Sequence, residues 1–439
     1  MTTDRLAEAQ RLHLSGDLAA AEGRYRDLLR THPEHADARH LLGFVLYQAG
    51  RAAEARTELV RALAADSSRP DGHFTLGLVL RQLGDPAGAI AAFEQATRLD
   101  PSLYFAWTNL ATLQEQAGQL AAAEASLIEA TRRDASRPDA WYLLAALYLR
   151  LGRFDEARRC NDRGILSDPP EQHPRPVRLH ALSGLDRHAE ARALLEDWLQ
   201  EKPAHPVALH LQAAYQGALP ERCSPGFVTA TFDRFAASFD DTLTRLHYTG
   251  PQLVREHLAD PDLGASKLDV LDLGCGTGLI GVELAPYARD LQGVDLSAAM
   301  LAQAAARAVY TRLQQADLVD FLAGTDATFD LITCLDTCIY LGRLDTMFAG
   351  VARCLRDGGQ FLFTTEKLED PQAVPGYHLR LSGRYAHHPA YVSAALEDCG
   401  LQVVHCIDTT LRMESGYPIM AQYFRVRRGP PAGYPHLAE

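Results

Sequence analysis

A glycine-rich stretch and three acidic positions give this chain its clearest chemical signal. Residues 272–278 read Asp-Leu-Gly-Cys-Gly-Thr-Gly and follow an apolar run typical of a buried strand. Glycines in a turn from a strand into a helix let the backbone approach a ligand closely. Two further aspartates follow later runs, in Val-Asp-Leu-Ser at 294–297 and Ala-Asp-Leu at 316–318. An acid after the second strand can accept both hydroxyls of a ribose, so the pattern predicts an adenosine-containing ligand.

A dinucleotide is the competing interpretation of the same glycines. Residues 276–281 read Gly-Thr-Gly-Leu-Ile-Gly and fit the G-x-G-x-x-G pattern, which is a weak signal alone. A nicotinamide cofactor would explain Asp295, but it leaves Asp272 and Asp317 without a role. It also requires a second parallel βαβ half, whereas residues 408–418 leave room only for a turn between the last two apolar runs. A dehydrogenase is therefore the trailing alternative.

Apolar runs that alternate with helical segments position these residues. Strands alternating with helices predict a mostly parallel sheet with helices on both faces, and the last two runs predict an antiparallel hairpin. The carboxyl ends of such strands meet at one edge of the sheet, where ligands bind. The predicted strands are 267–273, 291–296, 329–334, 360–365, 401–407 and 419–426.

The first half of the chain repeats every 34 residues. Glycine recurs at the turn position of each unit, as Gly16, Gly50, Gly84, Gly118 and Gly152. The period predicts helix, tight turn, helix, with glycine in the turn and small residues where two helices approach. This spacing resembles the tetratricopeptide repeat over about residues 2–205, with a sixth unit in which Asp186 replaces the glycine. The resemblance implies a solenoid whose groove binds peptides or protein segments.

In the second half, the ordered motifs resemble class I S-adenosylmethionine-dependent methyltransferases over about residues 230–428. The resemblance implies S-adenosylmethionine as cofactor, with the glycine loop around its methionine part, Asp295 on the ribose and Asp317 on the adenine amine. A narrower likeness, carried by 231–240, 246–248, 339–342 and 382–387, is to a bacterial group of predicted methyltransferases fused to tetratricopeptide repeats. The implied cofactor-binding residues are Asp272, Gly274, Cys275, Gly276, Thr277, Gly278, Asp295, Leu296, Asp317, Leu318 and Leu335.

The predicted organisation is an α-helical solenoid followed by a Rossmann-like α/β domain. Residues 1–216 form about six repeats and a capping helix, residues 217–230 form a linker rich in Pro, Gly and Ser, and residues 231–439 form the methyltransferase domain. Phe239 and Tyr248 precede the first strand. They either cover the cofactor or pack onto the sheet.

Four residues are candidates for catalysis: Asp336, Tyr340, Tyr385 and His387. In methyl transfer the cofactor carries the activation, so the protein positions the acceptor and a nearby base takes the acceptor's proton. The alternatives are a helix cap for Asp336 and a loop hydrogen bond for His387. His387 and His388 are adjacent but lack carboxylates at ligand spacing, so no metal site is expected.

Charge and composition narrow the partners and the compartment. The net charge is −13, and no basic stripe is present, which disfavours a nucleic-acid partner. The chain shows no signal-peptide pattern at its beginning and no apolar run of about 18 residues, so no membrane span is expected. Eight cysteines occur without a CxxC pair, which favours a reducing cytoplasm.

Three functions remain open, and the oligomeric state is not set by the sequence. The leading hypothesis is a methyltransferase acting on a protein or peptide recruited by the repeats. The second is a methyltransferase for a small molecule or natural product, in which the repeats recruit a partner. The third is a non-catalytic adaptor, which the intact glycine loop and acids disfavour.

Overall fold

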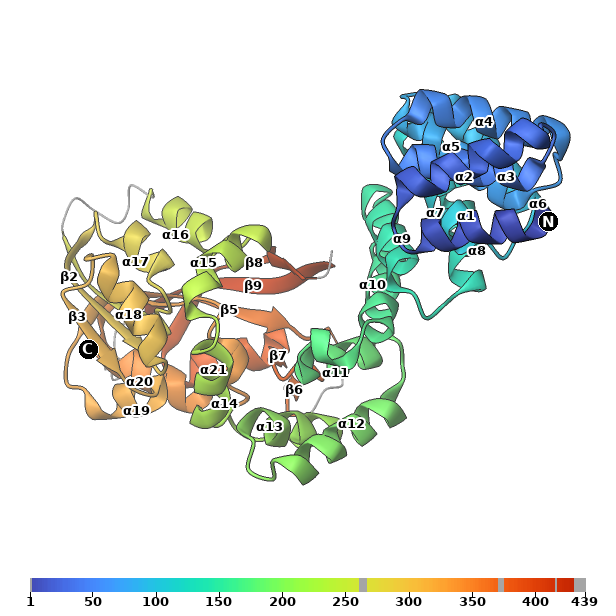
Figure 1. The fold of residues 1–439 in the computed structure, drawn as a ribbon. Coiled ribbons are helices and arrows are strands. Elements are labelled where there is room, and N and C mark those ends of the chain that lie inside the picture. The colour runs from blue at the N-terminus through green and yellow to red at the C-terminus, as the bar shows by residue number, and fades with distance from the viewer. Residues whose placement is uncertain (1, 260–266, 370–374, 415–416, 430–439) are drawn as a thin grey trace, which may run out of the picture. The chain divides into compact units, whose positions relative to one another are not determined.

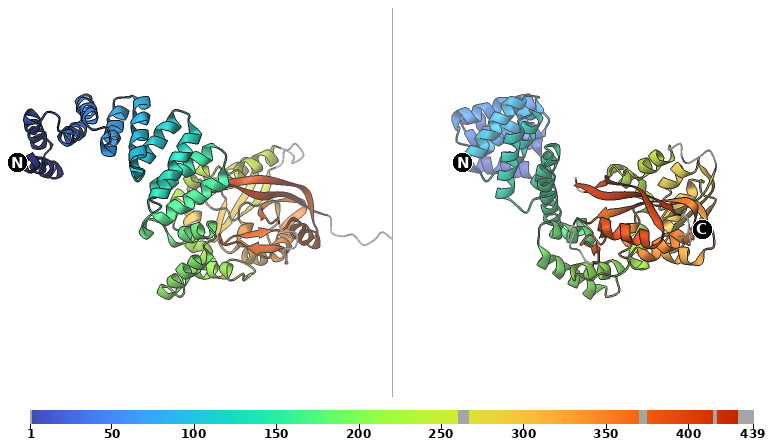
Figure 2. Two further views of the ribbon diagram at one scale, coloured as in Figure 1. Left: turned by 90° about the vertical axis from the view of Figure 1, so that its right-hand side faces the viewer. Right: turned by 180° about the vertical axis from the view of Figure 1, so that it is seen from behind.

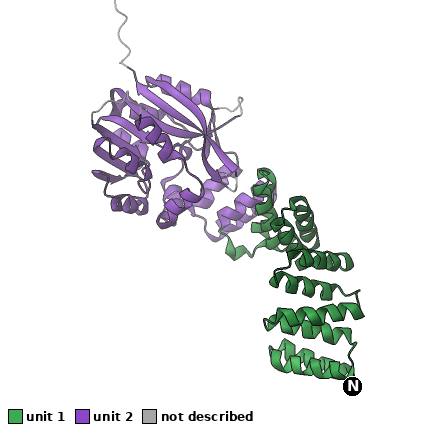
Figure 3. Cartoon of the chain, turned by 90° about the horizontal axis from the view of Figure 1, so that it is seen from above, with its two compact units in different colours: residues 1–174 green, residues 175–439 purple. Residues whose placement is uncertain are grey.

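The computed structural model describes residues 2–259, 267–369, 375–414 and 417–429 (Figure 1). The chain divides into two compact units, Met1–Pro174 and Arg175–Glu439, which Figure 3 shows in different colours. Among the described residues, no helix is both long enough and apolar enough to cross a membrane.

The first unit is a series of consecutive helices that pack in pairs (Figure 2). Each pair corresponds to one predicted 34-residue repeat, so the helical-repeat prediction is confirmed. The elements are α1 (Thr2–Leu14), α2 (Leu18–Thr31), α3 (Ala36–Gln48), α4 (Ala52–Ala65), α5 (Pro70–Gln82), α6 (Pro86–Leu99), α7 (Tyr104–Gln116), α8 (Leu120–Arg133), α9 (Pro138–Arg150), α10 (Phe154–Ser167) and the 3₁₀ helix η1 (Pro170–Gln172).

The backbone of the turns explains the glycine period. The five turn glycines, from Gly16 to Gly152, have φ between 70° and 84°. A side chain is strained in this left-handed region, so glycine is favoured. Asp186 stands at the same position of the sixth unit and has a φ of 60°. The turn conformation therefore persists where the sequence signal is lost.

Small residues in the repeats allow close helix packing. A Cβ atom on Gly77 would lie 2.6 Å from the ring of Phe93, and one on Gly43 would lie 2.6 Å from Cγ of Leu59. Phe93 and Leu59 are fully buried. In these two units the small position thus faces a large side chain on the paired helix.

The second unit begins with helices and continues into the α/β region. Its first elements are α11 (Arg175–Gly184), α12 (His188–Glu201), α13 (Pro206–Tyr215), α14 (Pro225–Phe232), η2 (Ala236–Ser238), α15 (Phe239–Arg245) and α16 (Gly250–Leu258). The later helices are α17 (Leu279–Leu284), α18 (Ala298–Ala306), α19 (Leu318–Gly324), η4 (Cys338–Tyr340), α20 (Asp345–Cys354) and α21 (Pro389–Asp398).

The unit boundary differs from the predicted domain boundary at residue 216. Helices α11–α13 belong to the second unit, and the predicted linker 217–230 contains most of α14. The physical reason is packing: Ala214 and Phe227 share one apolar cluster with Tyr377 and Tyr385 of the sheet region. Composition rich in Pro, Gly and Ser did not reveal this burial.

The described part of the sheet runs in the order β3-β2-β1-β4-β5-β7-β6, with β9 paired to β5 and β8 to β9. Strands β1 to β5 pair in parallel, whereas β8 and β9 form an antiparallel hairpin, as predicted. The strands β6 and β7, of three residues each, were too short to be recognised. The bounds are β1 (Leu268–Leu273), β2 (Ala288–Asp295), β3 (Arg312–Gln315), β4 (Phe329–Cys334), β5 (Leu355–Lys367), β6 (Tyr377–Leu379), β7 (Tyr385–His387), β8 (Leu401–Glu414) and β9 (Tyr417–Arg428).

Helices cover both faces of this sheet. One apolar cluster joins the sheet to α19, α20 and α21, and a second joins it to α16 and α17. Neighbouring strand residues fall in different clusters, for example Val270 and Leu271, because side chains alternate across a strand. Both faces are therefore buried, and the strand ends are left to form a site.

Candidate active site

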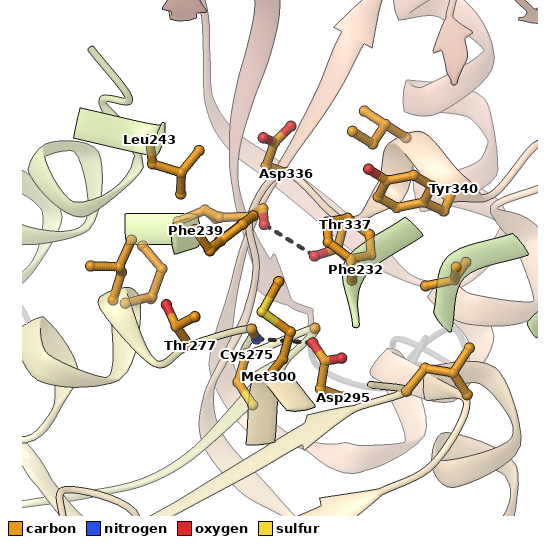
Figure 4. A pocket seen from close by; sticks show the side chains of 18 of the residues that line it. Phe232, Phe239, Leu243, Cys275, Thr277, Asp295, Met300, Asp336, Thr337 and Tyr340 are labelled. Atoms are coloured by element: carbon orange, nitrogen blue, oxygen red, sulfur yellow. Dashed lines mark hydrogen bonds between the residues drawn. The ribbon is translucent and has the colours of Figure 1, made fainter. Parts of the chain in front are cut away.

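A pocket of about 260 Å³ lies at the carboxyl ends of β1, β2 and β4. Figure 4 shows Asp295 and Asp336 toward opposite ends of this pocket. Eleven of the fifteen predicted site residues line it: Gly274, Cys275, Gly276, Thr277, Asp295, Leu296, Asp317, Leu318, Leu335, Asp336 and Tyr340. The lining excludes Asp272, Gly278, Tyr385 and His387.

The glycine loop between β1 and α17 forms an open cradle. Gly274, Gly276 and Gly278 have φ of 69°, 53° and 87°. A Cβ on Gly274 would lie 2.3 Å from Oγ1 of Thr337, whereas a Cβ on Gly276 would meet only Phe239, at 3.9 Å. A side chain at 276 would therefore point into the pocket. The loop has the shape that close approach of a bound ligand requires.

Asp295 stands at the end of β2 and is fixed by backbone donors. The N–H of Gly276 donates to Oδ2 at 2.9 Å, and the N–H of Ser297 donates to Oδ1 at 2.8 Å. Each carboxylate oxygen has two lone pairs, so each retains capacity for another donor such as a ribose hydroxyl. Burial raises the pKa of Asp295.

Asp272 lies beneath the loop rather than in the pocket lining. Tyr310 Oη donates to Oδ2 at 2.7 Å, and Thr333 Oγ1 donates to Oδ1 at 2.8 Å. Burial raises the pKa of Asp272 to about 6. Gly278 also packs on Tyr310: a Cβ atom added at Gly278 would lie 3.0 Å from Cε2 of the Tyr310 ring. Asp272 and Gly278, both predicted to bind the cofactor, thus contact Tyr310 and lie outside the pocket lining.

Asp317 lines the pocket and precedes the first residue of α19. Its Oδ1 accepts from the N–H of Val319 at 2.9 Å, which makes Asp317 the cap of that helix. Arg222 Nη1 donates to the same oxygen at 2.9 Å. The position fits the predicted contact with an adenine amine, and that contact stays a prediction.

An aromatic segment covers one side of the pocket. The rings of Phe232, Phe235 and Phe239 lie 5.5 to 6.0 Å apart between centroids, and all three line the pocket. Ser297 Oγ donates to Asp233 at 2.5 Å, and Thr277 Oγ1 donates to Asp240 at 2.6 Å. The segment 231–240 is therefore fastened to the glycine loop and to the start of α18.

Charged side chains form a buried network at the other end. Arg412, 3% exposed, donates to Asp336, to Glu366 at 2.8 Å and to Glu414 at 2.8 Å. Arg384 forms ion pairs with Glu366 at 3.0 Å and with Glu414 at 2.5 Å. Burial opposes the charge on Glu414, but Arg384 and Arg412 lower its pKa to about 2.

Asp336 is the acid of this network that faces the pocket. Its φ is 55°, and its N–H donates to Thr364 Oγ1 at 2.8 Å. Burial raises the pKa of Asp336 to about 6, although Arg412 opposes the shift. Helix α20 begins at Asp345 with Leu344 as its cap residue, so the alternative role of Asp336 as a helix cap does not apply.

Tyr385 and His387 lie in β7, outside the pocket. Tyr385 is fully buried and its Oη donates to the carbonyl of Pro220 at 2.7 Å. His387 is fully buried, and its Nε2 donates to the carbonyls of Leu341 and Gly342 at 2.9 and 3.1 Å. The alternative of a hydrogen bond without chemistry describes His387 better than acceptor contact. Both side chains are held away from the predicted acceptor position because β7 buries them.

Sequence analysis missed Arg222, Arg384, Arg412 and Glu414, all of which line the pocket or hold its residues. Arg384 lies inside the quoted motif 382–387, next to Tyr385. Arg412 and Glu414 are two residues apart and share one face of β8, a spacing that marks a common face of a strand. Among the described residues, no group of three or more potential metal ligands lies together.

Comparisons with known proteins agree with this arrangement. Residues 270–359 match a family model described as a methyltransferase domain. Residues 2–168 match a model described as the C-terminal domain of cilia and flagella-associated protein 70.

Individual relatives cover parts of the chain. Methyltransferase-like protein 27 of Homo sapiens is 39% identical over 105 residues, which cover 23% of this chain and 42% of that protein. The ubiquinone biosynthesis O-methyltransferase of Pseudomonas savastanoi pv. phaseolicola is 28% identical over 181 residues, 38% of this chain and 77% of that protein.

Two solved structures are similar to parts of this chain. MamA, at 18% identity and a TM-score of 0.35, covers 36% of this chain and 93% of its own. Magnesium protoporphyrin IX methyltransferase from Synechocystis PCC 6803 with bound SAM, at 20% identity and a TM-score of 0.35, covers 46% of this chain and 96% of its own.

Proposed function

We propose that this chain, which joins a tetratricopeptide-like repeat region to a class I S-adenosylmethionine-dependent methyltransferase domain, methylates a protein or peptide recruited by the repeats. One observation carries the proposal for the reaction. A single pocket combines the open glycine loop, Asp295 and Asp317 with Asp336, an acid whose pKa of about 6 suits a base near neutral pH.

The residues have separable tasks in this proposal. When bound, S-adenosylmethionine supplies a methyl group already activated by its sulfonium centre. The backbone of 274–277 and the carboxylates of Asp295 and Asp317 hold the cofactor. The rings of Phe232 and Phe239 exclude water from one side of the pocket. Asp336 accepts the proton that an N–H or O–H acceptor loses, because Arg412 occupies only one of its carboxylate oxygens.

The repeats support a macromolecular acceptor. Repeat stacks of this kind present extended surfaces that bind other chains. Because the repeats are fused directly to the catalytic domain, a chain that they bind would be held near that domain as a substrate. The proposed location is the cytoplasm, supported by buried thiols such as Cys334 and Cys338, whose sulfur atoms lie 3.8 Å apart without a bond.

A small-molecule acceptor is the second candidate. The Pseudomonas savastanoi relative named ubiquinone biosynthesis O-methyltransferase supports it, because the match covers 77% of that protein's length. The apolar rings around the pocket would also suit a small aromatic acceptor. In this case the repeats would recruit a partner enzyme instead of the substrate.

Methyl-labelled S-adenosylmethionine and an extract of the native host distinguish the two candidates. Label in macromolecules would support the first, and label only in small molecules would support the second. A chain beginning at Arg175 then tests recruitment, because a cut at residue 216 would remove Ala214 from its cluster with Tyr385. This chain should bind cofactor normally and lose turnover of the labelled protein.

Unchanged turnover of the labelled protein by the shorter chain would contradict recruitment by the repeats. Cofactor binding without transfer to any acceptor, by the full chain, would favour the adaptor function. The Asp336→Asn variant is the matched control for specific labelling, since it leaves the glycine loop intact.

A further inference from the structure

The segment that leads from α13 to α14 is hydrogen-bonded to the stretch of chain beside Tyr340, which lines the pocket. We call residues 220–223 the strap. Its backbone pairs with residues 340–343: the N–H of Cys223 donates to the carbonyl of Tyr340 at 2.9 Å, and the N–H of Gly342 donates to the carbonyl of Glu221 at 2.8 Å. An antiparallel bridge joins Arg222 to Leu341. The strap therefore acts as a short added strand at the pocket's edge.

Two side chains of β7 donate hydrogen bonds to the backbone of the strap and of the stretch that pairs with it. Tyr385 Oη donates to the carbonyl of Pro220 in the strap, and His387 Nε2 donates to the carbonyls of Leu341 and Gly342 in the paired stretch. All three carbonyl groups belong to the strap or to residues 340–343, with which it pairs. The two buried residues that lie outside the pocket thus have a structural target in common.

Arg222 links the strap to the adenine end of the cofactor site. Its Nη1 donates to Asp317 Oδ1 at 2.9 Å and lies 3.4 Å from Asp320. Asp317 is 15% exposed and lines the pocket. The strap thereby spans from the loop beside Tyr340, at the acceptor end, to the acid expected to bind adenine.

The strap also contacts α13, the helix predicted to cap the repeats. His210 of α13 is buried, and its Nε2 donates to the carbonyl of Gly383 at 2.9 Å. Cys223 Sγ lies 3.4 Å from the same nitrogen, and Cys223 lines the pocket. Helix α13 and the pocket wall therefore share direct contacts.

We propose that the strap is a working part of the cofactor site and that Arg222, through its ion pair with Asp317, is a positioning residue that sets cofactor affinity. The proposal rests on the assignment of the pocket to S-adenosylmethionine. The guanidinium fixes the orientation of Asp317 and holds the strap across the adenine end. Tyr385 acts at the other end of the strap by holding Pro220. Neither residue takes part in methyl transfer itself.

Isothermal titration of the full chain with S-adenosylmethionine and with S-adenosylhomocysteine tests the proposal without an acceptor. Arg222→Ala removes a partly exposed ion pair, so Kd should rise by up to about fivefold. Arg222→Glu places a carboxylate beside Asp317 and Asp320, and Kd should rise by about tenfold or more. The rise in Kd should be equal for both ligands, because the strap contacts the end of the pocket expected to hold adenosine, which both ligands contain.

Two further variants separate the strap from general effects of charge. Arg255→Glu reverses an exposed arginine that pairs with Glu283 on α17, outside the pocket lining, and should leave Kd unchanged. Tyr385→Phe removes only the hydroxyl donor to Pro220. It should raise Kd for both ligands and leave kcat at saturating cofactor unchanged, whereas a catalytic tyrosine would show the reverse.

Unchanged Kd in both Arg222 variants would overturn the proposal, as would a Tyr385→Phe variant that lowers kcat at unaltered Kd. Neither result would contradict the proposed function, because the wild type, titrated in the same series, would still bind the cofactor. Absence of any binding by the wild type would instead overturn the cofactor site itself, and the strap with it.

Discussion

Replacement of Arg412 by glutamine should shift the pH dependence of methyl transfer. Asp336 accepts a proton only when ionised, so the rate of the wild type should rise with pH through about 6, the pKa set by burial and opposed by Arg412. The Arg412→Gln substitution removes the guanidinium that donates to Asp336. Glu366 and Glu414 remain nearby and favour the neutral form further. The pKa of Asp336 must therefore rise.

The size of the shift follows from Coulomb's law. Two unit charges about 4 Å apart interact by about 4 kcal/mol at an effective dielectric constant of about 20. Since about 1.4 kcal/mol corresponds to one pKa unit, the loss is worth up to about 3 units, and about 2 units after relaxation of Arg384. The half-maximal rate should move from about pH 6 to about pH 8, which lowers kcat/KM at pH 7 by about tenfold.

The assay is kcat/KM for the labelled acceptor between pH 5 and pH 9 at saturating cofactor. Arg412→Lys keeps the positive charge and should hold the midpoint within about one unit of the wild type. Asp336→Asn should abolish the acid limb and lower the rate by about 100- to 10,000-fold. Carboxyl ¹³C NMR follows the pKa of Asp336 without an acceptor. A midpoint that stays at pH 6 in Arg412→Gln would refute the electrostatic reasoning.

Three further outcomes test other parts of the structure. Gly276→Ala should weaken cofactor binding in calorimetry, whereas Gly358→Ala, also at positive φ but with open space around its Cβ, should not. Gly77→Ala pushes a methyl group against Phe93 and should lower the free energy of urea unfolding by about 1 to 3 kcal/mol at unaltered cofactor Kd. His387→Asn should destabilise the fold, because the buried imidazole donates to the carbonyls of Leu341 and Gly342. It should keep the acid limb of the pH–rate profile near pH 6, because burial lowers the pKa of His387 to about 4, well below that limb. Loss of that limb would return His387 to the catalytic residues.

The sequence alone determined the features that depend on local pattern. The 34-residue period gave the helix pairs because each turn needs one residue at positive φ, and Gly50 or Gly84 supplies it. The glycine loop and the acids after successive strands predicted one group of pocket-lining residues, because parallel strands place their carboxyl ends at one edge. The residues Asp295 and Asp317 were found from spacing in the same way.

Only the tertiary structure decided the acceptor end and the strap. Tyr385 reaches Pro220, 165 positions earlier, and Arg412 reaches Asp336, 76 positions earlier. No local period encodes such contacts, so sequence reasoning counted Tyr385 and His387 among the candidates for catalysis although neither lines the pocket. It also could not find the partners of Asp336. Strand pairing and burial fix which side chains face a pocket, and both depend on segments that meet only after the chain has folded.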